Sequence, residues 1–236
     1  MNDTPEASGT TEVPEPTPTP DRTDRPDRTD APPAGLAGPA IPSGRLVLVR
    51  HGETEWSRTG QHTGLTDLPL LPEGEEAARG LRQVLEGRRF VHVRSSPLQR
   101  ATATADLAGL EVDELDADLV EWDYGAYEGR STADVRAELG YHWTVFEHGV
   151  LPGTTPGETV EEVAARASRV LDRIWPLLFE GDVCLVGHGH ALRVLAAVYL
   201  RQAPRFGAHL TFEVGAVAVL GHHHEDPVVE AWNRHR

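Results

Sequence analysis

The chain has 236 residues, with 37 acidic side chains, 22 Lys or Arg and a formal net charge of −15. All 22 of those basic side chains are arginine. An excess of negative charge this large argues against nucleic acid or an anionic membrane as a partner, because both select positively charged surfaces. The single cysteine excludes an internal disulfide framework and is typical of a cytoplasmic protein.

Residues 1–43 differ in composition from the rest of the chain. They hold 10 of the 18 prolines, no Phe, Tyr or Trp, and a net charge of −5. Such a segment cannot bury enough apolar surface to offset its ordering entropy, so we predict that it is disordered. It lacks the basic start and apolar core of a secretory signal, so we expect a cytoplasmic location. We expect residues 44–236 to form one folded domain without a membrane span.

Short β-branched runs alternate with amphipathic stretches along the rest of the chain. The predicted strands are residues 45–49, 91–95, 112–115, 183–186, 217–220 and 228–232. The predicted helices are residues 73–86, 97–107, 160–179 and 191–200. Ser96 followed by Pro97, and Thr159 followed by Glu162 three residues later, are typical helix starts. Pro176 should kink or end the third of these helices.

This alternation predicts an α/β fold, a three-layer sandwich whose mostly parallel central sheet has helices on both faces. Ligands of such sheets bind at the carboxyl ends of the strands. Two polar segments stand there, Arg50-His51-Gly52 after the first strand and Gly187-His188-Gly189 after the strand at residues 183–186. We therefore expect the functional site where these two segments meet.

Arg50-His51-Gly52-Glu53-Thr54 is the most informative segment of the chain. Four others accompany it in order, at residues 95–101, 121–129, 157–159 and 187–193. Together they resemble the histidine phosphatase superfamily, in its phosphoglycerate mutase-like branch, over almost all of residues 45–236. Residues 121–129 resemble the acid phosphatases of actinobacteria within this family. Residues 60–70 resemble the members of the sedoheptulose-bisphosphatase type, which act on sugar bisphosphates.

The resemblance implies roles for five catalytic residues. His51 would attack phosphorus and form a phosphohistidine, while His188 would hold the group in transfer. Arg50 and Arg100 would bind the phosphate, because a guanidinium group can direct two N–H groups at its oxygens. Glu121 would supply the proton that the leaving group needs. Asp123, two residues further on, is the competing candidate for that last role.

The same resemblance implies the surroundings of the substrate. A small helical cap insertion at residues 120–157 would carry the general acid. The expected substrate-binding residues are Ser57, Thr63, Gly64 and His190. The aromatic residues of the insertion leave two interpretations open, since they could line the leaving-group pocket or pack in the core. These residues are Trp122, Tyr124 and Tyr127.

The resemblance therefore implies an enzyme that hydrolyses phosphomonoesters without a metal or a cofactor. Its substrates would be small phosphorylated metabolites, sugar phosphates among them. A phosphoglycerate mutase is the first alternative, but only 27 residues separate Gly129 from Gly157, and a longer basic insertion is typical of mutases. A catalytically silent relative that binds phosphorylated ligands is the second. His222-His223-His224 is not expected to bind a metal, because consecutive strand residues face opposite sides. A homodimer is the expected assembly.

Overall fold

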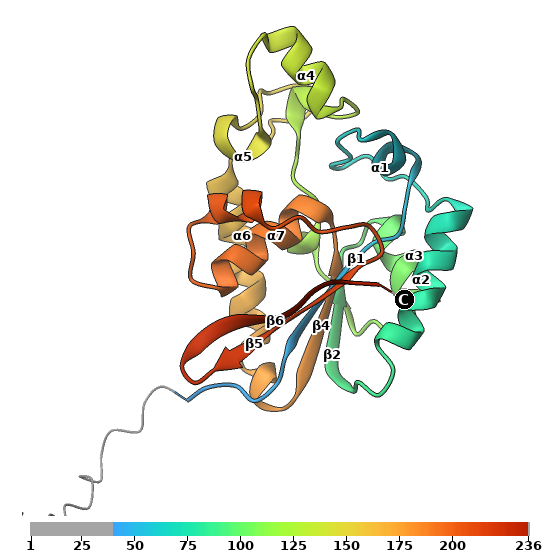
Figure 1. The fold of residues 1–236 in the computed structure, drawn as a ribbon, viewed down its shortest axis with the longest axis vertical. Coiled ribbons are helices and arrows are strands. Elements are labelled where there is room, and N and C mark those ends of the chain that lie inside the picture. The colour runs from blue at the N-terminus through green and yellow to red at the C-terminus, as the bar shows by residue number, and fades with distance from the viewer. Residues whose placement is uncertain (1–39, 236) are drawn as a thin grey trace, which may run out of the picture. The chain divides into compact units, whose positions relative to one another are not determined.

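A six-stranded sheet runs through residues 40–235, the part of the chain that the computed structural model describes (Figure 1). The strand order is β3-β2-β4-β1-β5-β6. The strands are β1 (Leu46–Arg50), β2 (Phe90–Ser95), β3 (Glu114–Leu115), β4 (Asp182–Gly187), β5 (Val217–His223) and β6 (Asp226–Arg234). The predicted disordered segment, residues 1–43, lies outside the described residues apart from residues 40–43.

The first four strands in this order, β3, β2, β4 and β1, are parallel to one another, whereas β5 pairs in the antiparallel sense with both of its neighbours. β1 pairs with β4, β4 with β2, and β2 with β3 in the parallel sense. β5 pairs antiparallel with β1 and returns as β6 in a hairpin. The predicted mostly parallel α/β sheet is therefore confirmed, and the two C-terminal strands account for its mixed character.

Side chains of β1 alternate between two hydrophobic cores. Leu46 and Leu48 pack into the core on one face of the sheet, and Val47 and Val49 into the core on the other. All four are fully buried. A continuous apolar run is what a strand covered on both faces requires, since successive side chains point to opposite sides.

Helices cover both faces of the sheet. The helices are α1 (Glu55–Thr59), α2 (Pro72–Val84), α3 (Gln99–Leu107), α4 (Thr132–Leu139), α5 (Val145–His148), α6 (Val160–Ile174) and α7 (Gly189–Tyr199). Figure 1 shows α2 and α3 on one side of the sheet, and α6 and α7 on the other. None of the helices within residues 40–235 combines the length and apolarity needed to cross a membrane.

The helix starts follow the sequence signals in one case and not in the other. At α6, the Thr159 hydroxyl accepts the N–H of Glu162, and the Glu162 carboxylate accepts the N–H of Thr159, which confirms the predicted capping box. The prediction that Ser96 caps the helix after the second strand is wrong. That helix, α3, begins at Gln99 with Leu98 as its N-cap, and the Ser96 hydroxyl lies 2.8 Å from the ring of His188 and accepts the N–H of Leu98.

The segment between β3 and α6 carries its own small core. It contains α4 and α5 (Figure 1), which confirms the predicted small helical cap insertion, although the individual helices were not predicted. Their apolar side chains pack with Trp122, Tyr127 and Trp143, all of them buried. Val163 of α6 and Val194 of α7 join the same cluster, so this segment is attached to one helical layer of the fold.

The capping box predicts a measurable contribution to stability. Thr159→Ala removes the hydroxyl that accepts the Glu162 N–H, so the free energy of unfolding should fall by about 1 kcal/mol in urea denaturation. Ser168→Ala in the same helix is the control. Among residues 40–235 its hydroxyl bonds only to the Ala164 carbonyl one turn earlier, and its loss should leave stability unchanged or slightly raised. Equal destabilisation by the two substitutions would contradict the cap assignment.

Candidate active site

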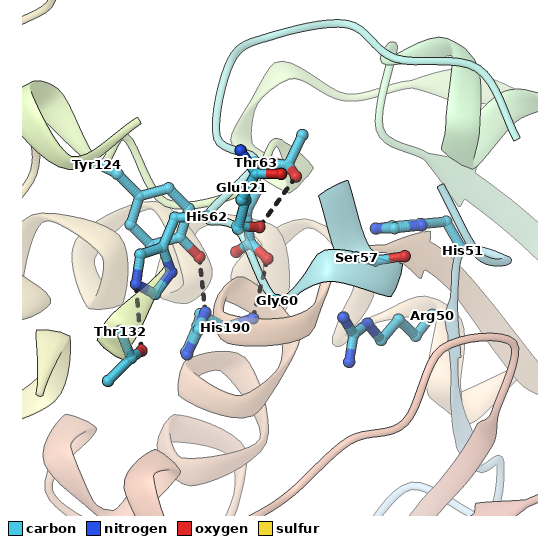
Figure 2. Close-up of a pocket in the computed structure, with 11 residues that line it drawn as sticks. Arg50, His51, Ser57, Gly60, His62, Thr63, Glu121, Tyr124, Thr132 and His190 are labelled. Atoms are coloured by element: carbon cyan, nitrogen blue, oxygen red, sulfur yellow. Dashed lines mark hydrogen bonds between the residues drawn. The ribbon is translucent and has the colours of Figure 1, made fainter. Parts of the chain in front are cut away.

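A cavity of about 200 Å³ opens beyond the carboxyl end of β1 (Figure 2). The residues that line it are Arg50, His51, Ser57, Gly60, Gln61, His62, Thr63, Glu121, Tyr124, Thr132 and His190. The β1–β4 pairing sets Arg50 directly beside Gly187, so the residues that follow the two strands, His51 and His188, come together. Their ring centroids lie 5.1 Å apart.

His51 is held as a neutral imidazole with one free nitrogen. Its backbone N–H donates to the Gly187 carbonyl, and its ring Nδ1 lies 2.7 Å from the Gly52 carbonyl oxygen. Since a carbonyl only accepts, Nδ1 carries the proton and Nε2 keeps its lone pair. Burial first, and then Arg50 and Arg100, hold the ring pKa well below its usual value. The uncharged ring therefore presents a nucleophilic nitrogen at neutral pH.

His188 has the opposite tautomer. Its Nδ1 accepts a hydrogen bond from Nε of Arg100 at 3.1 Å, so the proton sits on Nε2, 2.8 Å from the Ser96 hydroxyl. Burial lowers the pKa of His188, and the charge of Arg100 lowers it further. The ring is thus a neutral hydrogen-bond donor beside His51.

Arg100 is fully buried at the base of the site. Besides its bond to His188, its guanidinium group donates to the carbonyls of Thr63, Gly64 and Thr66 at 2.8–3.1 Å. This arginine fixes the loop that follows α1 and sets the tautomer of His188. Arg100 and His188 are not among the side chains that line the cavity itself.

Arg50 presents an unsatisfied donor at the cavity. One of its terminal nitrogens donates to the Phe212 carbonyl, whereas its buried Nε has no hydrogen-bond partner among residues 40–235. A buried N–H without a partner is costly, and an anion would satisfy it. Close packing fixes this guanidinium, because a Cβ on Gly189 would come within 3.0 Å of its central carbon.

Glu121 is fixed by backbone N–H groups. One carboxylate oxygen accepts from Trp122 and Ala191 at 2.9 and 2.8 Å, and the other accepts from His190 at 3.0 Å. Two of these N–H groups belong to the first turn of α7, where the helix dipole also favours a negative group. The carboxyl group is thereby held at the cavity wall.

Asp123, the competing candidate for the same role, lies elsewhere. Its carboxylate accepts the N–H groups of Gly125 and Gly157 at 2.9 and 3.1 Å and the hydroxyl of Thr155. It borders a second cavity that contains none of the histidines. Asp123 therefore holds the segment around Gly125 and Gly157. It does not line the first cavity, which contains His51, His62 and His190 and which we call the histidine cavity.

The predicted substrate-binding residues lie in different environments. Ser57, Thr63 and His190 line the cavity, although the Ser57 hydroxyl also takes part in the capping box of α1 with Thr54. Gly64 does not line it. The Gly64 N–H donates to the Glu128 carboxylate, and its carbonyl accepts from Arg100. The role of all four in binding a substrate stays a prediction.

The sequence analysis assigned no role to His62 or Thr132, which also line the cavity. Thr132 Oγ1 lies 3.3 Å from Nε2 of His62, whose ring lies 4.6 Å from that of Tyr124. The Tyr124 hydroxyl is hydrogen-bonded to His190 Nδ1 at 2.6 Å. Trp122, Tyr124 and Tyr127 all pack in the small core, and of these three Tyr124 also lines the cavity.

For His62, the only sequence signal was its place in the loop at residues 60–70 that resembles sugar bisphosphatases. Thr132 carried no signal, because it lies 70 positions from His62 in the chain. Within residues 40–235, no three His, Cys, Asp or Glu side chains are grouped so that they could hold a metal ion.

Comparison with protein families and curated proteins finds clear relatives. The model of the histidine phosphatase superfamily (branch 1) matches residues 46–235. An acid phosphatase of Mycobacterium tuberculosis is 35% identical over 182 residues, which cover 76% of this chain and 87% of that protein. Sedoheptulose 1,7-bisphosphatase of Saccharomyces cerevisiae is 36% identical over 185 residues, 66% and 67% of the two chains. A 2,3-bisphosphoglycerate-dependent phosphoglycerate mutase of Nautilia profundicola is 32% identical over 188 residues, 63% and 81%.

A solved structure has the same fold. The structure of an open reading frame product from Mycobacterium tuberculosis superposes with a TM-score of 0.77 at 32% identity. The match covers 82% of this chain and 98% of the other. The agreement of fold extends over nearly the whole described part of the chain.

The buried histidines predict that acid destabilises the fold. Burial lowers the pKa of His62 from 6.5 to about 4, so below pH 6.5 the unfolded chain binds a proton that the folded chain excludes. The stabilising contribution is complete above pH 6.5 and is lost as the pH falls towards 4. Between pH 7 and 5 the loss from His62 should be about 2 kcal/mol.

Urea denaturation of the wild type and of His62→Gln at both pH values isolates this contribution. Other buried histidines titrate equally in both proteins, so the variant should show the smaller loss of stability on acidification. An identical pH dependence in the two proteins would refute the assignment.

Proposed function

Because this chain belongs to the histidine phosphatase superfamily (branch 1), we propose that its histidine cavity hydrolyses phosphomonoesters through a phosphohistidine on His51. The observation that carries the proposal is the tautomer of His51. Its Nδ1 proton is bound by the Gly52 carbonyl, which leaves the Nε2 lone pair free, and the neighbouring residue Arg50 brings its unsatisfied Nε to the same cavity. A nucleophile and an anion-binding donor thus stand together at the end of one strand.

In the proposed first step, Nε2 of His51 attacks phosphorus and forms an N–P bond as the ester P–O bond breaks. The electron pair of that bond leaves on the alcohol oxygen, which takes a proton from the Glu121 carboxyl. Arg50 donates to the phosphoryl oxygens, and the Nε2 proton of His188 turns from the Ser96 hydroxyl to those oxygens as charge develops on them. Arg100 supports this step by keeping His188 in that tautomer.

In the proposed second step, the Glu121 carboxylate takes a proton from water, whose oxygen attacks the phosphohistidine. The N–P bond breaks, inorganic phosphate leaves, and both His51 and Glu121 return to their starting states. No metal takes part in either step. The backbone N–H groups that hold Glu121 keep its carboxyl at one place through both proton transfers.

Hydrolysis is favoured over mutase activity by the charges around the cavity. A mutase must retain a bisphosphate, which needs cations at both ends. Of the side chains in residues 40–235 that line the cavity, Arg50 is the one that carries a positive charge. A catalytically silent relative is disfavoured because all five predicted catalytic residues are present. Arg50 and His51 lie at the end of β1, and His188 follows β4. Arg100 is hydrogen-bonded to His188.

The proposed substrates are small phosphorylated metabolites, including sugar phosphates. Relatives named acid phosphatase and sedoheptulose 1,7-bisphosphatase support this range. We also propose a cytoplasmic location, because one cysteine in 236 residues suits a reducing compartment. A homodimer is proposed from the prevalence of symmetric dimers among soluble oligomers, and sedimentation at several concentrations tests it.

The nucleophile is tested directly with p-nitrophenyl phosphate in excess EDTA. The wild type should release phosphate at the same rate with and without the chelator. His51→Ala should lose about a thousandfold or more of kcat, because the covalent route is abolished. His142→Ala, at an exposed position away from the cavity, is the control and should keep full activity. Equal rates in the His51 variant and the wild type would overturn the mechanism.

The pH profile is a second test. Because burial and two arginines lower the pKa of His51, the nucleophile stays unprotonated in mild acid. A histidine of ordinary pKa would lose about 25-fold of its reactive form between pH 7 and 5. We expect kcat/KM at pH 5 to remain within a few-fold of its value at pH 7. A loss of about 25-fold between pH 7 and 5 would contradict the lowered pKa of the nucleophile.

A further inference from the structure

The two ends of the histidine cavity differ in chemistry. In Figure 2 the Arg50 and His51 side chains lie at one end, His62, Tyr124 and Thr132 lie at the other, and Glu121 lies between them. The proposed phosphoryl site is the Arg50 end. The leaving group must then extend past Glu121 towards the opposite wall, which we call the far wall and define as Gln61, His62, Thr63, Tyr124, Thr132 and His190.

The far wall is polar but uncharged. It presents hydroxyl groups, one amide and two imidazole rings. Burial lowers the pKa of His62 to about 4 and also lowers that of His190, so both rings are neutral at pH 7. Burial raises the pKa of the Tyr124 hydroxyl, which keeps its proton. These groups can exchange hydrogen bonds with a ligand, but they offer it no counter-charge.

The nearby arginines are engaged elsewhere. The Arg193 guanidinium donates to the carbonyls of Gly207 and Ala208 and lies 4.7 Å from the Phe146 ring centroid. Arg130 pairs with the Glu138 carboxylate at 2.5 Å. Neither arginine is among the residues that line the cavity. Each would have to give up its present partners to reach a ligand at the far wall.

A second anionic group on the substrate would be poorly accommodated there. It would lose its hydration among neutral groups and would also lie near the Glu121 carboxylate, without a cation to offset either cost. Hydroxyl groups meet the opposite situation, because the far wall supplies both donors and acceptors for them. The cavity, at about 200 Å³, is also smaller than the roughly 300–1,000 Å³ typical of sites for larger ligands.

We propose that the substrate carries a single phosphate on a small, uncharged, hydroxyl-bearing leaving group such as a polyol or a sugar, and that the far wall selects against a second phosphate or a carboxylate. This inference rests on the proposed function, since it assumes that the Arg50 end holds the phosphoryl group. It narrows the substrate class within that function, because sugar bisphosphates and phosphorylated acids become poor substrates.

Matched pairs of substrates test the proposal. In the first pair, glycerol 3-phosphate carries a hydroxymethyl group where 3-phosphoglycerate carries a carboxylate. In the second pair, fructose 1,6-bisphosphate carries one phosphate more than fructose 6-phosphate. For the wild type, kcat/KM should favour the less charged member of each pair about tenfold or more. Turnover of p-nitrophenyl phosphate, measured in parallel, reports on the proposed function independently.

A charge introduced at the far wall should reverse the preference. Thr63→Lys places a cation there, so the ratio of kcat/KM values should shift towards the more charged substrates about tenfold. Thr102→Lys is the matched control. Thr102 is also half-buried with its hydroxyl on a backbone carbonyl, but it lies on α3 outside the cavity, and its variant should keep the wild-type ratio.

The outcomes separate the two proposals. A wild-type enzyme that hydrolyses p-nitrophenyl phosphate but prefers the bisphosphate or the phosphorylated acid would overturn the substrate class and leave the proposed function intact. Absence of any turnover would overturn both. An unchanged ratio in a folded Thr63→Lys protein would show that the far wall does not select, and Thr132→Lys provides a second cation on the same wall should the first variant not fold.

Discussion

Arg100 is completely buried, yet each of its guanidinium nitrogens has a hydrogen-bond partner. A buried cation is tolerated only when it is satisfied in this way. Three of its bonds end on carbonyls of residues 63–66, so the loop that carries Thr63 is fixed to α3. The fourth ends on His188 and sets the tautomer of that ring. The loop, the second histidine and the helix therefore take their positions around one side chain.

The electrostatics of the site follow from the same burial. Low solvent access disfavours protonation of His51 and His188, and the neighbouring arginines disfavour it further. The overall charge of −15 thus gives no guide to the local field, because Arg50 and Arg100 act together on His51. Glu121 is held opposite by the first N–H groups of α7, so acid, nucleophile and anion donor keep separate positions.

The parallel pairing of β1 with β4 brings these groups together across the sequence. Register matches Arg50 with Gly187, and the backbone of His51 bonds to the same glycine. A shift of one residue would turn the strand side chains to the wrong faces, and the two cores that bury Leu46 and Val47 prevent it. The packing of the sheet is therefore also what holds the two rings 5.1 Å apart.

By itself the sequence determined the α/β class, the six strands and the polar segments at their ends, because periodicity and strand-end chemistry are local properties. It also identified the five proposed catalytic residues, through short motifs whose spacing carries the resemblance. Tertiary structure alone decided that the Ser96 hydroxyl lies against His188, a histidine 92 positions away. It alone decided that Tyr124 faces the cavity and that Thr132 meets His62, because these contacts join distant segments through packing that no local pattern encodes.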